Sequence, residues 1–194
     1  MNNTNSKLTK KLVITAMLTA LVVILQFVSM NLRFSMFSIT LTLVPIVLGA
    51  ALCGISSGMW LGFVFGVVVL LTGDAAAFLA VNIPGTIITV LVKGAVCGLF
   101  SGLVYKALSR FNTYLAVAAA AIAAPVANTG VFLIGCLLFF MPTITEWAAG
   151  LGFGDNVGKY MIVGLVGVNF LIELAINVVL SPVIVRLINI RNKQ

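Results

Sequence analysis

The stretch LVITAMLTALVVILQFV, residues 12–28, decides the fold because it contains no charged side chain and few polar ones. A helix needs roughly 20 consecutive, mostly apolar residues to cross a bilayer, and comparable stretches recur to the end of the chain. The whole sequence is 62% hydrophobic and 8% charged, and its mean hydropathy is +1.25. We therefore expect a lipid bilayer to be the solvent of this protein.

Apolar runs predict six membrane spans, at about residues 12–28, 39–53, 59–71, 85–105, 114–140 and 159–187. A tight turn at 54–58 precedes the short third span, and Pro84 begins the fourth, where a proline costs no hydrogen bond. Pro125 is expected to kink the fifth span. The sequence thus predicts an all-α membrane protein with six transmembrane helices, forming a single domain over residues 1–194.

Basic residues at the ends of the runs predict the orientation. Six spans place both termini on one side, together with eight of the eleven Lys and Arg residues: Lys7, Lys10, Lys11, Lys106, Arg110, Arg186, Arg191 and Lys193. Since Lys and Arg concentrate in cytoplasmic loops, we expect cytoplasmic termini in a multi-pass protein of the cell membrane. The long outer loops would then be 29–38, 72–84 and 141–158, and a solute would bind on that face.

Several function classes are disfavoured by what the sequence lacks. The net charge of +7 does not indicate nucleic-acid binding, which needs a basic patch on a folded surface. Histidine is absent, and Cys53, Cys97 and Cys136 are isolated in apolar runs, so neither a metal site nor catalysis is expected. No phosphate-binding Gly-x-x-x-x-Gly-Lys-Ser/Thr loop is present. We expect no enzyme and no cofactor, so energy for any pumping would come from another subunit or an ion gradient.

Ionisable and amide side chains inside the spans are the candidate binding residues. Lys93 and Glu173 are costly in a bilayer unless they are paired or face water. Asn169, Glu173 and Asn177 share one helix face by their i, i+4, i+8 spacing, and Asn128 adds a polar group on the fifth span. Either Lys93 and Glu173 form a buried pair that locks two helices, or these groups line a cavity for a small polar solute. In the second case Lys93 would meet an anionic group.

Two further polar residues lie in the outer loops. Asn82 precedes Pro84 and would either cap the fourth span or contact a ligand. Arg33 would either be solvated or belong to a loop that folds over the cavity. Both are therefore candidate substrate-binding residues.

Small residues recur at every fourth position, which lets helices approach closely in lipid. The two series are Ala50, Gly54, Gly58, Gly62, Gly66 and Gly94, Gly98, Gly102. We interpret both as internal packing. The step from Ala16 to Ala20 on the first span is different, because a flat patch near the cytoplasmic end suits docking of a helix from another protein.

The sequence resembles the substrate-binding S components of energy-coupling factor (ECF) transporters. The likeness rests on the length, the spans, the Ala16-x-x-x-Ala20 step, and the stretches TGDAAAF (72–78) and NIPG (82–85), which are similar to those of vitamin-uptake members. It implies a subunit that captures a vitamin outside and docks on a transmembrane coupling (T) protein bearing two ATP-binding cassette ATPases. The resemblance leans to pantothenate, with folate next. The competing hypotheses are a self-sufficient secondary transporter or channel, which often shows an internal repeat, and an intramembrane enzyme.

Overall fold

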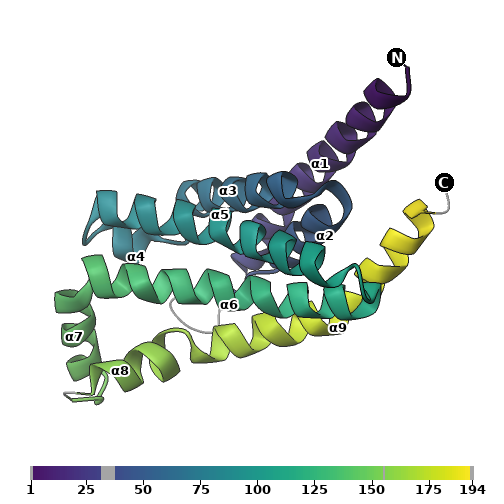
Figure 1. Ribbon diagram of the computed structural model, residues 1–194. Helices are drawn as coiled ribbons and strands as arrows, with labels where there is room; N and C mark the ends of the chain where they lie inside the picture. Colours follow the sequence, from purple (N-terminus) through teal and green to yellow (C-terminus); the bar gives the residue numbers. More distant parts are fainter. Residues whose placement is uncertain (1, 32–37, 155, 193–194) are drawn as a thin grey trace.

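The computed structural model describes residues 2–31, 38–154 and 156–192, which form helices and no β-strand. The helices pack side by side as an elongated bundle, with both chain ends at one end of it (Figure 1). The long helices are α1 (Asn2–Ser29), α3 (Ile55–Thr72), α5 (Ile83–Leu108), α6 (Thr113–Phe139) and α9 (Gly167–Asn192). The shorter ones are α2 (Leu43–Cys53), α4 (Ala76–Leu79), α7 (Met141–Gly150), α8 (Val157–Lys159) and the π-helix η1 (Tyr160–Leu165).

The five long helices are apolar enough to cross a membrane, and α2 is a shorter apolar helix. This confirms the all-α membrane fold. The second predicted span, 39–53, is wrong at its start, because the helix begins only at Leu43. The preceding residues are not helical, and their backbone donors are used elsewhere: the Leu41 N–H donates to the Ser29 hydroxyl.

The third span is longer than its sequence predicts. Instead of a turn over 54–58, only Gly54 leaves the helical conformation, with a positive φ of 92° that glycine adopts at little cost. The N–H groups of Ser57 and Gly58 already donate to the Gly54 carbonyl, so the helix starts at once. The result is an 18-residue helix, which is a full span.

The last predicted span, 159–187, is wrong as a continuous helix. A six-residue π-helix and the non-helical Val166 separate α8 from α9. A Cβ on Gly167 would lie 2.7 Å from the carbonyl oxygen of Ile162, so the chain turns here only because glycine has no side chain. Short π segments inside helices frequently mark functional sites.

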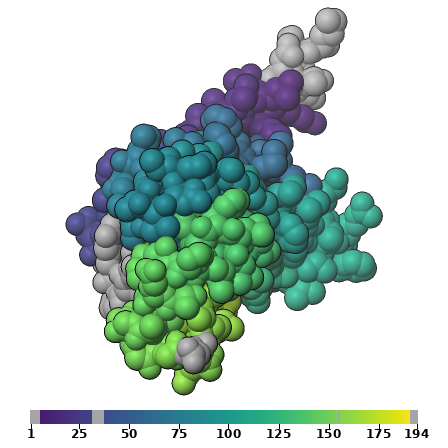
Figure 2. All heavy atoms as spheres, turned by 90° about the vertical axis from the view of Figure 1, so that its left-hand side faces the viewer, coloured from purple at the N-terminus to yellow at the C-terminus, as the bar shows by residue number. Residues whose placement is uncertain are grey.

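The expected outer loops contain short helices that close one end of the bundle. Figure 2 looks onto this end, where α7 and α8 lie. An aromatic cluster at this end is centred on Phe78 of α4. The Phe78 ring makes edge-to-face contacts with Phe132, Phe140 and Trp147, at centroid distances of 5.5, 4.9 and 5.5 Å. Such contacts stabilise beyond simple apolar burial, so α4 and α7 are fixed to the C-terminal end of α6.

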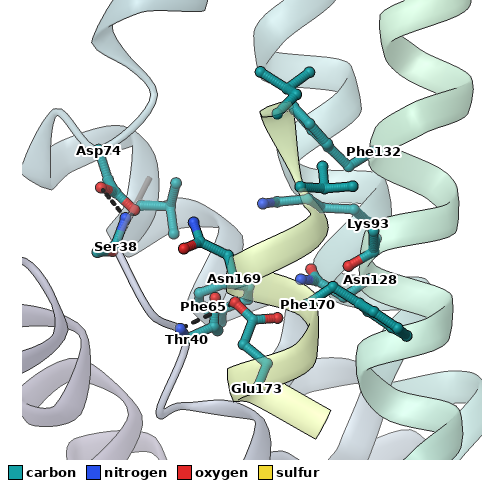
Figure 3. Close-up of a pocket in the computed structure, with 14 residues that line it drawn as sticks. Ser38, Thr40, Phe65, Asp74, Lys93, Asn128, Phe132, Asn169, Phe170 and Glu173 are labelled. Carbon is teal, nitrogen blue, oxygen red and sulfur yellow. Dashed lines mark hydrogen bonds between the residues drawn. The ribbon is translucent and has the colours of Figure 1, made fainter. Parts of the chain in front are cut away.

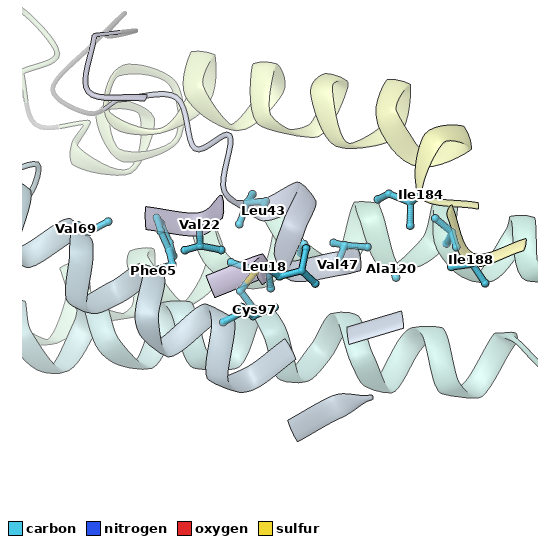
Figure 4. Close-up of a cluster of buried hydrophobic side chains, with 14 of the residues drawn as sticks. Leu18, Val22, Leu43, Val47, Phe65, Val69, Cys97, Ala120, Ile184 and Ile188 are labelled. Atoms are coloured by element: carbon cyan, nitrogen blue, oxygen red, sulfur yellow. The ribbon is translucent and has the colours of Figure 1, made fainter. Parts of the chain in front are cut away.

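A second apolar cluster joins the helices nearer the other end. Leu18, Val47, Cys97 and Ile184 bring α1, α2, α5 and α9 together (Figure 4). The short α2 contributes many residues to this cluster and is largely buried. Helix α2 therefore packs mainly inside the bundle rather than against lipid.

Facing glycines hold α3 against α5. A Cβ on Gly62 would overlap the carbonyl oxygen of Gly94, and one on Gly98 would overlap the carbonyl oxygen of Gly58. The helical glycines of the two series are thus internal packing, as predicted: Gly58, Gly62, Gly66, Gly94, Gly98 and Gly102. Close backbone approach of this kind maximises van der Waals contact where lipid supplies no hydrophobic driving force. The prediction is wrong for Gly54, which is exposed and where an added Cβ would meet nothing within 4 Å.

We predict that Gly62→Ala lowers the melting temperature of the purified protein by at least about 2 °C, because overpacking costs about 1–3 kcal/mol. The matched control is Gly130→Ala on α6, where an added Cβ meets nothing within 4 Å. That variant should melt at the wild-type temperature or above, since alanine favours helix. Equal melting of Gly62→Ala and wild type in the same detergent would contradict the packing described.

Candidate functional site

A cavity lies between α3, α5, α6 and α9, beside the break in the last span (Figure 3). Its volume is about 40 Å³, which exceeds the roughly 10–15 Å³ that one water needs. Its polar lining comprises Ser38, Thr40, Asp74, Lys93, Asn128, Thr129, Asn169 and Glu173. A concentration of polar groups inside apolar spans is expensive in a bilayer and points to function.

Two of the carboxylates are held by the non-helical residues that precede α2. The Ser38 hydroxyl donates to Asp74 Oδ2 at 2.7 Å, and the Thr40 N–H donates to Glu173 Oε1 at 3.0 Å. The Thr40 N–H is available to the carboxylate because this segment is not helical, in agreement with the late start of α2. Asp74, Ser38 and Thr40 were missed by the sequence reasoning, although Asp74 is one of only four acidic residues in the chain.

Lys93 enters the cavity from α5 between two aromatic rings. Its Nζ lies 5.7 Å from the ring centroid of Phe65 and 5.4 Å from that of Phe132. Both distances are within the range of cation–π attraction. Within the described part of the chain, Lys93 forms no ion pair at 4.0 Å or less, with Glu173 or any other acid. The geometry therefore does not support the hypothesis of a buried Lys93–Glu173 pair.

The polar face that we predicted for the last span is buried. The part of this face nearer the start of α9 reaches the cavity. Asn169 and Glu173 line the cavity, whereas Asn177 lies one turn further on, fully buried, and donates to the Glu173 backbone carbonyl at 2.8 Å. From α6, Asn128 contributes a buried Oδ1 that has no hydrogen-bond partner among the described residues. The cavity thus contains an acceptor that a solute N–H or O–H would satisfy.

The remaining sequence candidates lie elsewhere. Asn82 caps α5, since its Oδ1 accepts from the Gly85 N–H at 2.9 Å, and it lines neither the cavity above nor the adjoining one. Arg33 is outside the described residues. Ala16 and Ala20 are both exposed on α1. The four residues Lys93, Asn128, Asn169 and Glu173 are therefore the predicted set that the structure brings together.

A smaller cavity of about 20 Å³ adjoins the first and extends toward α4. Lys93 and Phe132 line both cavities, so their side chains form part of the partition between them. The second cavity is bordered by Phe78 and Phe140 and by Thr89, whose buried hydroxyl oxygen has no partner among the described residues. Movement of the Lys93 and Phe132 side chains would join the two spaces.

Comparison with known families identifies the chain. The family described as "ECF transporter, substrate-specific component" matches residues 10–185. The protein belongs to this family. Comparisons with curated proteins and with solved structures give no significant match.

The substrate-specific component is a membrane-embedded transport subunit, and such subunits are not enzymes. Membership favours a subunit that works with a T protein and ATPases over a self-sufficient transporter. The polar cavity is the natural candidate for its substrate site, because it combines the Lys93 ammonium, which has no ion-pair partner among the described residues, with two aromatic faces and several polar groups.

We predict that Lys93→Met leaves the melting temperature of the unliganded protein unchanged or raises it. The substitution keeps most of the apolar stem and removes a charge that has no ion-pair partner in the described structure. If Lys93 instead neutralised Glu173, the variant would strand a carboxylate at a cost of ~3–5 kcal/mol. Earlier melting that the double variant Lys93→Met, Glu173→Gln restores would show that the pair exists.

Proposed function

We propose that this ECF transporter substrate-specific component captures a small water-soluble vitamin from the outer face of the cell membrane and holds it in the Lys93 cavity. The best candidate is pantothenate, and folate is next. Both termini would lie in the cytoplasm, as the basic residues at the ends of the spans favour. A T protein and two ATPases would drive release inward.

The observation that carries the proposal is the ammonium of Lys93, which faces the cavity without an acidic partner in the described residues. A substrate carboxylate would supply the missing anion in a place where water is scarce, so the contact would be strong. Asn128 Oδ1 and the carboxylate of Glu173 are acceptors for hydroxyl or amide donors of the same solute. Pantothenate carries one carboxylate together with hydroxyl and amide donors, and this combination matches the lining.

The size of the cavity also favours a small solute. Ligand sites are usually about 300–1,000 Å³, whereas the two cavities measure about 40 and 20 Å³. Side chains therefore fill most of the proposed site, and some of them would have to turn aside for a vitamin to bind. Turning Lys93 and Phe132 aside would join the cavities, and a compact vitamin would require less rearrangement than folate.

Docking on the T protein is proposed for the exposed side of α1. Ala16 and Ala20 lie one turn apart on that side and present little bulk. Gly58 and Gly62 of α3 are buried against α5 and are unavailable for a partner. The docking surface would therefore rest on the α1 alanines rather than on the glycines of α3.

We predict that the isolated protein binds one vitamin without ATP, and that Lys93→Met weakens this binding by one to two decades. The loss corresponds to a charge-assisted contact of about 1.5–3 kcal/mol. Calorimetry against a panel of vitamins measures both. The control is Lys159→Met, which removes an exposed lysine that is not part of the cavity lining. Absence of any binding, or full affinity in Lys93→Met, would contradict the proposal.

We also predict that Ala16→Trp and Ala20→Trp abolish vitamin uptake in cells while the purified variants keep wild-type affinity. A bulky ring would prevent close approach of a partner helix. Ala175→Trp, on an exposed position of α9, is the matched control and should transport normally. If the α1 variants lost binding and uptake equally, the alanines would belong to internal packing.

A further inference from the structure

A groove at the opposite end of the bundle from α4 and α7 combines basic and apolar lining. It has a volume of about 630 Å³ and runs between α1, α2, α3 and α5. Lys11, Lys106, Ser56 and Ser109 form its polar part. Leu99 lies seven residues before Lys106 on α5, ~10 Å deeper along the helix, and forms apolar lining together with Met59.

Among the described residues, the two lysines of this groove have no acidic partner. The chain contains four acidic residues: Asp74 and Glu173 line the distant cavity, and Glu146 is on α7. The fourth, Asp155, is outside the described residues. Lys11 Nζ donates only to the neutral Ser56 hydroxyl, at 3.5 Å. Both ammonium groups are therefore available to an anion from outside the protein.

We propose that this groove binds one anionic phospholipid of the cytoplasmic leaflet. Its phosphate would lie between Lys11 and Lys106, with the hydroxyls of Ser56 and Ser109 as further donors. Its acyl chains would follow the apolar lining past Met59 and Leu99. Basic pockets between transmembrane helices on the cytoplasmic side are suited to such head groups.

The apolar lining distinguishes a lipid from a soluble anion. Inorganic phosphate would satisfy the two lysines but would leave Met59, which is 44% exposed, uncovered. The groove follows the helices inward from their basic ends, so its polar part lies at the water boundary and its apolar part at the depth of the acyl chains. The charged-to-apolar order matches that of a phospholipid.

Native mass spectrometry of the purified protein tests this site, with phosphatidylglycerol and phosphatidylcholine of identical acyl chains as probes. The wild type should retain one phosphatidylglycerol and bind it more tightly than phosphatidylcholine. Lys11→Gln combined with Lys106→Gln should weaken phosphatidylglycerol binding at least about tenfold. The control, Lys7→Gln with Lys10→Gln, removes the same charge from exposed positions on α1 outside the groove, and should bind as wild type does.

Three results would overturn the proposal. These are equal retention of the two lipids by the wild type, equal losses in the two double variants, and displacement of phosphatidylglycerol by millimolar inorganic phosphate. Lys11→Arg with Lys106→Arg keeps the charge and should retain the lipid, which separates loss of the site from misfolding. The inference does not depend on the vitamin site.

Discussion

The close contact between α3 and α5 is the constraint on which the rest of the structure depends. Facing glycines let the two backbones meet at Gly62 and Gly94, and Phe65 and Lys93 each lie within one turn of this contact. The ring of Phe65 is consequently placed 5.7 Å from the ammonium of Lys93. The glycine contact, which involves no polar side chain, thus positions Lys93, the charged residue of α5 that lines the cavity.

Most of the fold was predictable because spans in a bilayer must be long, apolar and helical. The polar residues of the site were predictable because polar groups are costly inside such spans and therefore stand out as functional candidates. These residues are Lys93, Asn128, Asn169 and Glu173. Their convergence on one cavity agrees with the interpretation of a polar interior, whereas their individual roles in substrate binding stay predictions.

The errors have local physical causes. Hydropathy does not distinguish a continuous apolar helix from one interrupted by a π-helix, so the break before Gly167 was missed. The break places Glu173 six residues into α9, ~9 Å from its start. Asp74 was overlooked because it follows a span, and its hydrogen bond with Ser38 joins residues 36 positions apart. For Asn82, the sequence was equally compatible with a helix cap and with a ligand contact. The hydrogen bond that its Oδ1 accepts from the Gly85 N–H identifies it as the cap of α5.

The two ends of the bundle have different properties that suit a transport subunit. One end is closed by aromatic packing around Phe78 and contains the polar cavity, while the other presents lysines and the exposed small residues of α1. Lys93 has aromatic contacts but no acidic partner among the described residues, so a substrate anion would supply the missing counter-charge there. Binding energy is then available to rearrange Phe132 and the side chains around it.

A structure of the protein with its bound vitamin would test the central claim most directly. The account predicts that the solute occupies the joined cavities, with an anionic oxygen about 2.7–2.9 Å from Lys93 Nζ and a donor facing Asn128 Oδ1. A solute bound elsewhere, or Lys93 turned into an ion pair with Glu173 in the liganded protein, would contradict it.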